Sequence, residues 1–161
     1  MTENELSTES SFPVPWKVLV VDDEEEVHLL IKMVLDDLVY NERAVELLDA
    51  YSSKDAIKLL HEHDDVAVAL IDVIMEHDEA GLQLVRTIRK EMKDTLLRII
   101  MRTGINGESL QEQLFVDFDI NDYKDKGELT AEKLRAAVIN AFRSYADLRK
   151  ITELNSSLEK K

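Results

Sequence analysis

The decisive stretch of this sequence is Lys17-Val18-Leu19-Val20-Val21-Asp22-Asp23. Its apolar part is short, unbroken and rich in β-branched side chains, which is typical of a strand buried on both faces of a sheet. The run ends abruptly at two aspartates, and three glutamates follow at positions 24–26. Residues 24–38 then show the three- and four-residue apolar spacing of an amphipathic helix. The stretch therefore predicts a buried strand and a helix, with acidic side chains at their junction.

The same alternation of strand and helix continues along the chain. Further strands are predicted at 45–50, 66–71, 96–101 and 118–123, and further helices at 53–60, 82–92, 108–115 and 130–145. Strand–helix units at this spacing predict a parallel sheet with helices on both faces, joined by right-handed crossovers. In open sheets of this kind, ligands bind beyond the carboxyl ends of the strands.

Composition narrows the class of protein. The chain has 161 residues, 45% of them hydrophobic, which is enough to bury a core without disulfides. With 34 acidic and 20 basic residues, the net charge of −14 argues against a nucleic-acid surface and against an anionic-membrane surface. The absence of cysteine excludes a disulfide scaffold, a cysteine-ligated zinc site and a cysteine nucleophile, and fits a cytoplasmic protein. No apolar run reaches the length of a membrane span, and the acidic N-terminus lacks the basic start of a signal peptide.

We expect three parts along the chain. Residues 1–15 are polar, contain both prolines and are predicted to form a flexible N-terminal tail. Residues 16–146 would form the domain, and residues 147–161 a C-terminal helical extension or linker. From Tyr145 to Leu158, apolar residues recur at three- and four-residue steps, over too short a stretch to define a coiled coil. Two interpretations stay open: a helix that simply extends past the domain, or a linker helix that pairs two copies or leads to an output domain.

Polar side chains stand where the predicted strands end. The first strand ends at Asp22 and Asp23, the third at Asp72 and the fourth near Thr103, and Lys126 follows the fifth. Because parallel strands share their carboxyl edge, these groups are expected to converge there. Carboxylate oxygens suit Mg²⁺, and the metal and the lysine would relieve the repulsion among the carboxylates. A carboxylate oriented in this way can attack phosphorus and form an aspartyl phosphate.

Each of these residues also has an ordinary structural explanation when taken alone. Asp22 and Asp23 suit the N-terminus of a helix, where the helix dipole favours carboxylates. Asp72 and Thr103 would serve a turn after a strand, and Lys126 would be a surface lysine. The functional interpretation depends on all five standing together at the strand ends.

The pattern resembles the receiver domain of two-component response regulators. The matching residues are Val20-Val21-Asp22-Asp23, Asp72 at a strand end, Gly81, Thr103-Gly104 and Asp122-Tyr123-Lys124-Asp125-Lys126. The resemblance covers residues 16–146, most of the chain. It implies a flavodoxin-like α/β fold, a doubly wound five-stranded parallel sheet with strand order 2-1-3-4-5.

The resemblance also implies roles for single residues. Asp72 would be the phosphoacceptor, with Thr103 and Lys126 contacting the phosphoryl group. The metal ligands for Mg²⁺ would be Asp22, Asp23, Asp72 and the backbone carbonyl of Ile74. Thr103 and Tyr123 would form the conformational switch.

By the same resemblance, the chain would be a cytoplasmic signalling switch rather than a turnover enzyme. The switch would catalyse its own phosphotransfer and autodephosphorylation. Its partners would be a sensor histidine kinase or a phosphotransfer protein, and an output domain or partner protein. We expect no direct contact with nucleic acid or membrane, and the last helix offers a route to a homodimer. Residues 121–130 resemble a receiver subgroup that precedes larger output modules, some of which handle cyclic dinucleotides.

Two features depart from the family's pattern. Gly127 stands where the family has proline in a cis peptide, and we expect no cis peptide there because a cis bond without proline is costly. In the loop after Asp72, where the family usually has Met-Pro, Met75 is followed by Glu76, and Gly81 comes one residue late.

Two rival functions stay open. A Mg²⁺-dependent phosphohydrolase with an aspartyl nucleophile also places carboxylates at strand ends, but it normally needs a second carboxylate where this chain has Ile74. A phosphorylation-independent interaction module on the receiver fold is favoured by Gly127 and the altered loop, and opposed by the intact set of site residues. Rapid turnover of small phosphate esters would identify the phosphohydrolase.

Overall fold

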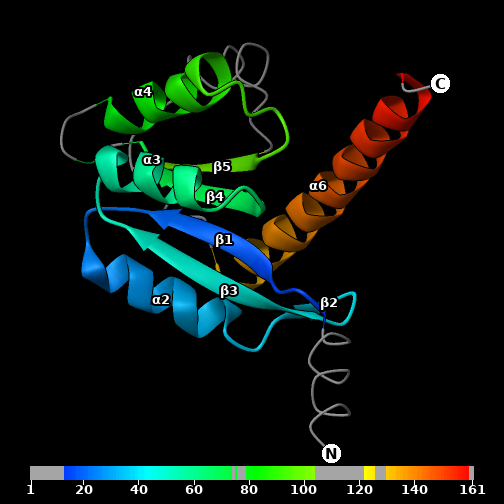
Figure 1. Cartoon of the computed structure of the whole chain (residues 1–161). Helices are drawn as coiled ribbons and strands as arrows, with labels where there is room; N and C mark the ends of the chain where they lie inside the picture. The colour runs from blue at the N-terminus through cyan, green and yellow to red at the C-terminus, as the bar shows by residue number, and fades with distance from the viewer. Residues whose placement is uncertain (1–12, 74, 76–78, 104–121, 126–129, 160–161) are drawn as a thin grey trace, which may run out of the picture.

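The computed structural model describes residues 13–73, 75, 79–103, 122–125 and 130–159, with the backbone alone for 103, 122–125 and 159 (Figure 1). Its helices are α2 (Glu25–Leu35), α3 (Ser53–Glu62), α4 (Ala80–Arg86) with a π-helical continuation (Thr87–Glu91), and α6 (Ala131–Glu159). Its strands are β1 (Trp16–Val21), β2 (Val39–Tyr40), β3 (Arg43–Ala50), β4 (Val66–Asp72), β5 (Arg98–Thr103) and β6 (Asp122–Asp125).

The strands form one sheet in the order β2-β3-β1-β4-β5-β6. From β3 to β6 all neighbours are parallel, so these five strands have the predicted 2-1-3-4-5 order and the flavodoxin-like fold class is confirmed. The two-residue β2, antiparallel to β3, is an addition that the sequence did not predict. Its turn uses Asn41 and Glu42 at φ 51° and 62°, without the glycine that usually marks such a hairpin.

Helices cover both faces of the sheet. On one face Leu19 and Val21 of β1 pack with apolar residues of α3 and α4, and on the other Val18 and Val20 pack with α2 and α6. Figure 1 shows α3 and α4 on one side of the strands and α2 on the other. Every residue of β4 is buried. The unbroken apolar runs are therefore strands buried on both faces, as their composition predicted.

Several strand boundaries differ from the prediction, among them those of β5 and β6. β5 begins at Arg98 rather than at residue 96, because the side chain of Asp94 accepts hydrogen bonds from the backbone N–H groups of Leu96 and Leu97, both 3.1 Å, and holds them in a turn. β6 continues to Asp125, which pairs with Thr103, instead of ending at residue 123. The predicted helix at 108–115 and the peptide before Gly127 lie outside the described residues.

The last helix is much longer than the domain requires. It begins after Thr130, whose hydroxyl accepts a hydrogen bond from the N–H of Lys133 (3.2 Å), and continues to Glu159. Residues 151–158 are all exposed. Figure 1 shows this end of α6 projecting beyond the sheet. Within the part of the chain that the structure describes, no helix is both long and apolar enough to cross a membrane.

We predict that Phe142→Ala lowers the free energy of unfolding by about 3–5 kcal/mol. Phe142 is fully buried and stacks on Trp16, with ring centroids 4.7 Å apart, so truncation leaves a cavity between β1 and α6. Denaturant unfolding followed by fluorescence of Trp16, the single tryptophan, measures the change. Leu154→Ala, at a position 58% exposed, is the matched control, and equal stability losses in the two variants would contradict this packing.

Candidate functional site

Three carboxylates converge at the carboxyl edge of the sheet. Asp22, Asp23 and Asp72 place oxygen atoms within 4.8 Å of one another. Asp22 and Asp72 are buried, and Asp23 is exposed. Val21 and Ile71 are partners in the register of β1 and β4, so the aspartates that follow them lie side by side. The sequence-based prediction that these strand ends meet is borne out for the three aspartates.

Asp22 is held by its backbone and by its side chain. Its N–H donates to the carbonyl of Ala50 (3.1 Å), which continues the pairing of β1 with β3 beyond Val21. Its Oδ1 accepts a hydrogen bond from the N–H of Glu24 (2.9 Å), just before α2 begins. The carboxylate therefore serves the N-terminal end of α2 as well as the acidic cluster.

The second oxygen of Asp22 is paired with an arginine. Nη1 of Arg102 donates to Oδ2 of Asp22 at 3.2 Å, and the two side chains are only 9% and 1% exposed. Arg102 lies on β5 as the register partner of Asp72, and its carbonyl accepts the N–H of Val73 (3.0 Å). A buried guanidinium in this place supplies positive charge to the carboxylates.

Gly81 packs closely against the backbone of Asp72 at the end of β4. The N–H of Gly81, in the first turn of α4, donates to the carbonyl of Val73 (2.9 Å). A Cβ atom at Gly81 would collide with the carbonyl oxygen of Asp72 and would come within 2.8 Å of the Cα of Val73. The lack of a side chain thus lets α4 approach the backbone at the end of β4.

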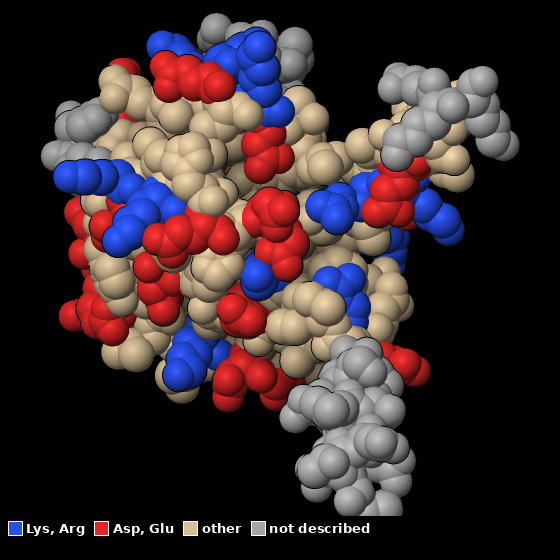
Figure 2. All heavy atoms as spheres, in the orientation of Figure 1, with Lys and Arg blue, Asp and Glu red and all other residues tan. Residues whose placement is uncertain are grey.

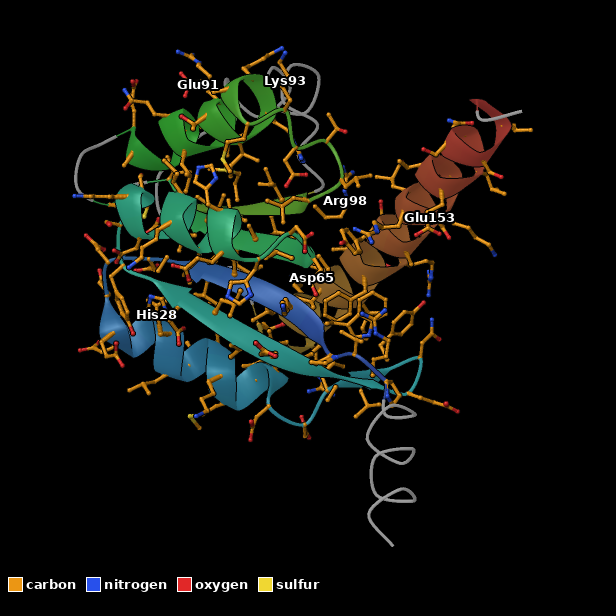
Figure 3. The ribbon with its side chains drawn as sticks, viewed as in Figure 1. His28, Asp65, Glu91, Lys93, Arg98 and Glu153 are labelled. Atoms are coloured by element: carbon orange, nitrogen blue, oxygen red, sulfur yellow. The ribbon has the colours of Figure 1, made fainter. Side chains whose placement is uncertain are left out.

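A buried histidine supports the site from α2. His28 places Nε2 2.8 Å from the carbonyl oxygen of Asp22 and Nδ1 2.7 Å from Oδ1 of Asp49 on β3. Figure 3 shows His28 between α2 and β3. The rings of His28 and Tyr51 pack together, with their centroids 4.2 Å apart. The pKa of Tyr51 is raised to about 12, mainly by a hydrogen bond to Glu25. The contact of His28 with the carbonyl oxygen of Asp22 fixes the backbone at Asp22.

The donor set at this edge fits a hard divalent cation. Three carboxylates offer oxygen atoms within 4.8 Å of one another, and one of them belongs to an exposed side chain, Asp23. Mg²⁺ prefers oxygen ligands, retains several waters and is commonly held by one or two carboxylates. Figure 2 shows acidic side chains interspersed with basic ones over the face of the molecule in view.

The remaining predicted site residues are described less fully. The backbones of Thr103 and Tyr123 lie on β5 and β6, with Tyr123 paired to Met101. Ile74 and Lys126 lie outside the described residues.

The sequence interpretation missed Arg102 and gave His28 no role. A signal was present for the first, because an arginine inside the apolar run Arg98-Ile99-Ile100-Met101-Arg102 needs a buried partner. For His28 the signal was weaker. Its position in the helical repeat suggests that it faces the core, but the sequence does not indicate which residues it contacts.

Comparison with known proteins places this fold and site in one family. The family model of the response regulator receiver domain matches residues 18–139. The 3′3′-cGAMP-specific phosphodiesterase 2 of Vibrio cholerae serotype O1 is 40% identical over 134 residues, which cover 83% of this chain and 26% of that protein. The chain thus spans about a quarter of the length of this curated relative.

Solved structures agree with the family match. A response regulator receiver domain protein from Clostridium thermocellum has a TM-score of 0.67 and 27% identity, covering 83% of this chain and 98% of that one. NtrX from Brucella abortus shares the fold at a TM-score of 0.70 and 20% identity, over 86% of this chain and 29% of that one. The chain belongs to the response regulator receiver domain family and is the receiver domain of a two-component response regulator.

We predict that Gly81→Ala destabilises the protein by about 1–3 kcal/mol, although alanine ordinarily stabilises a helix relative to glycine by about 1 kcal/mol. The new methyl group would push against backbone atoms of Asp72 and Val73, which cannot move aside as a flexible side chain could. Thermal or denaturant unfolding measures the difference, and a variant more stable than the parent would contradict this contact.

Proposed function

We propose that this receiver domain accepts a phosphoryl group on Asp72, in the presence of Mg²⁺, from a sensor histidine kinase or a phosphotransfer protein. The observation that carries the proposal is the convergence of Asp22, Asp23 and Asp72 at the ends of two neighbouring strands. Asp72 suits the acceptor because it is the last residue of β4 and is buried, so that its carboxylate is held in one place. Asp22 accepts hydrogen bonds from Glu24 and Arg102 and is proposed to have a supporting role.

The proposed transfer needs one nucleophile and charge neutralisation. An oxygen of Asp72 attacks the phosphorus atom, the bond between phosphorus and the donor's leaving nitrogen breaks, and the electron pair leaves with the imidazole, which takes up a proton. Bound Mg²⁺ would neutralise the charge of the phosphoryl oxygens. We assign Asp22, Asp23, Asp72 and the carbonyl of Ile74 to hold the ion. Lys126 and the Thr103 hydroxyl are proposed to contact the phosphoryl group.

Phosphorylation is proposed to shift a conformational equilibrium through Thr103 and Tyr123. Their strands, β5 and β6, are direct neighbours, with Met101 paired to Tyr123 and Thr103 to Asp125. A change at the end of β5 can therefore reach β6 without an intermediate element. Such a ligand acts by favouring one of two existing arrangements.

The output is proposed to be a module that handles cyclic dinucleotides. The support is the 40% identity to part of a 3′3′-cGAMP-specific phosphodiesterase, in which the matched region is 26% of the protein. In this proposal the chain itself is the switch, and a phosphodiesterase activity would reside in a separate module. A cytoplasmic location is proposed with it, supported by the absence of cysteine.

The helix α6 is proposed to act as a linker that pairs two copies of the chain. Its distal part carries Ile151, Leu154 and Leu158, which are 53%, 58% and 66% exposed. These positions recur at three- and four-residue steps, so they form one stripe along about 10 Å of helix. An apolar stripe on a projecting helix is the surface that a parallel partner helix would cover.

Intact mass spectrometry after incubation with Mg²⁺ and a small phosphoryl donor tests the proposed acceptor. We expect the mass of one phosphoryl group to be added to the parent chain and not to Asp72→Asn. Asp65→Asn is the matched control, because Asp65 precedes β4 at its opposite end and pairs with Lys17 (2.8 Å). Figure 3 shows Asp65 at that opposite end, away from His28.

Addition to Asp72→Asn would contradict the assignment of Asp72. No addition to the parent chain, with folding and Mg²⁺ binding verified, would favour a phosphorylation-independent interaction module. Release of many equivalents of phosphate per chain would favour a phosphohydrolase instead.

Light scattering during size-exclusion chromatography tests the linker proposal. We expect a concentration-dependent dimer for the parent chain and a monomer for the Leu154→Lys, Leu158→Lys double variant, because charged side chains would have to be buried in the pair. A parent chain that stays monomeric at high micromolar concentration would contradict pairing through α6.

A further inference from the structure

Arg102 is the one cation that the described residues place on the acidic cluster. The distance from its Nη1 to Oδ2 of Asp22 is 3.2 Å, and the whole residue is 7% exposed. A guanidinium stays protonated in proteins, so burial cannot be relieved by loss of its charge. The contact with Asp22 is therefore an ion pair with little water to screen it.

The position of Arg102 in the sheet shows how it reaches Asp22. Arg102 is the register partner of Asp72, and β4 lies between β1 and β5. Neighbouring strands are about 4.8 Å apart, so β1 and β5 are separated by about 10 Å. The arginine side chain thus extends across the strand end that carries Asp72 to pair with the carboxylate on the far side.

The pairing leaves one hydrogen-bond donor of Arg102 without a partner among the described residues. Its Nε is buried and has no hydrogen-bond partner among the described residues. Arg98, on the same strand and equally buried, donates from Nε to the carbonyl of Leu96 (3.0 Å) and from Nη2 to that of Thr95 (2.6 Å). A buried donor without a partner is costly, so Arg102 is held at the site by the charge of the carboxylates rather than by a complete set of hydrogen bonds.

Asp22 has no oxygen left without a partner. Oδ1 accepts from the N–H of Glu24 and Oδ2 from Arg102. A divalent cation bound to Asp22 would lie close to the Arg102 guanidinium, because both contact the same carboxylate. The two positive charges would repel each other.

We propose that Arg102 is a resting-state counter-ion of Asp22 at the phosphorylation site and competes with Mg²⁺ for this carboxylate. Without metal, Arg102 neutralises the buried Asp22, and when the cation binds, the guanidinium gives up this carboxylate. Arg102 thereby weakens metal binding relative to what the three carboxylates would give alone. The inference rests on the proposed Mg²⁺ site and adds a residue that sets its affinity.

Calorimetric titration with Mg²⁺ at low ionic strength tests the competition. We expect Arg102→Met to bind Mg²⁺ about tenfold more tightly than the parent, because the competing positive charge is gone. Arg102→Lys, which keeps the charge, and Arg98→Met, which removes an equally buried arginine at the other end of β5, are expected to stay close to the parent. Unchanged or weaker binding by Arg102→Met would overturn the inference.

Thermal unfolding supplies a readout that a purely structural role would not give. In chelator, Arg102→Met is expected to unfold at a lower temperature than the parent, because Asp22 is left buried without its partner. Saturating Mg²⁺ should then raise the unfolding temperature more for Arg102→Met than for the parent. Equal increments in the two proteins would overturn the competition.

NMR of the parent protein follows Arg102 itself during the titration with Mg²⁺. The Nε–Hε resonance of Arg102 in an NMR spectrum, assigned by its loss in Arg102→Lys, should move on addition of Mg²⁺, whereas that of Arg98 should stay. An unmoved Arg102 resonance at saturation would overturn the inference while leaving the metal site intact. In the calorimetric titration, the parent chain could bind no Mg²⁺ and give the same heat as Asp22→Asn. That result would overturn the proposed function and the inference together.

Discussion

Carboxylates buried at the end of a parallel sheet must be balanced by positive charge or by hydrogen bonds, and much of this structure follows from that requirement. Asp22 is fully buried and Asp72 almost so, and with Asp23 they crowd within 4.8 Å. The balance for Asp22 comes from the N–H of Glu24 and from Arg102. Loss of one partner from such a buried pair costs about 3–5 kcal/mol, so removal of Arg102 from β5 is expected to be costly.

The surrounding elements keep the carboxylates in place. The parallel register of β1 with β4 sets Asp22 beside Asp72, and His28 on α2 fixes the backbone of Asp22. Gly81 allows α4 to approach the end of β4 without a side chain between them. These supports come from both faces of the sheet, so the site is built by the whole fold rather than by one loop. A rigid frame of this kind is what a phosphoacceptor needs, because the reacting oxygen has to be positioned before the donor arrives.

Much of this arrangement can be predicted from the sequence, because it depends on patterns among neighbouring residues. The runs ending at Asp22 and Asp72 are unbroken and apolar, so strand type, burial on both faces and the carboxyl edge could all be inferred. The pairing of Asp22 with Arg102 could not, because the partners are 80 residues apart and no local pattern links them. The hairpin strand β2 was missed because it depends on a turn without glycine, and the start of β5 because Asp94 captures two backbone N–H groups.

We infer that the carboxyl edge of β1 and β4 holds a divalent cation in exchange for Arg102. The most direct test of this inference is a crystal structure of the chain grown with Mn²⁺, with the ion located by its anomalous scattering. We expect one peak within bonding distance of Asp22, Asp23 and Asp72, with the Arg102 guanidinium moved away from Asp22. A peak-free site at saturating Mn²⁺, or a bound ion with the Arg102–Asp22 contact still in place, would contradict it.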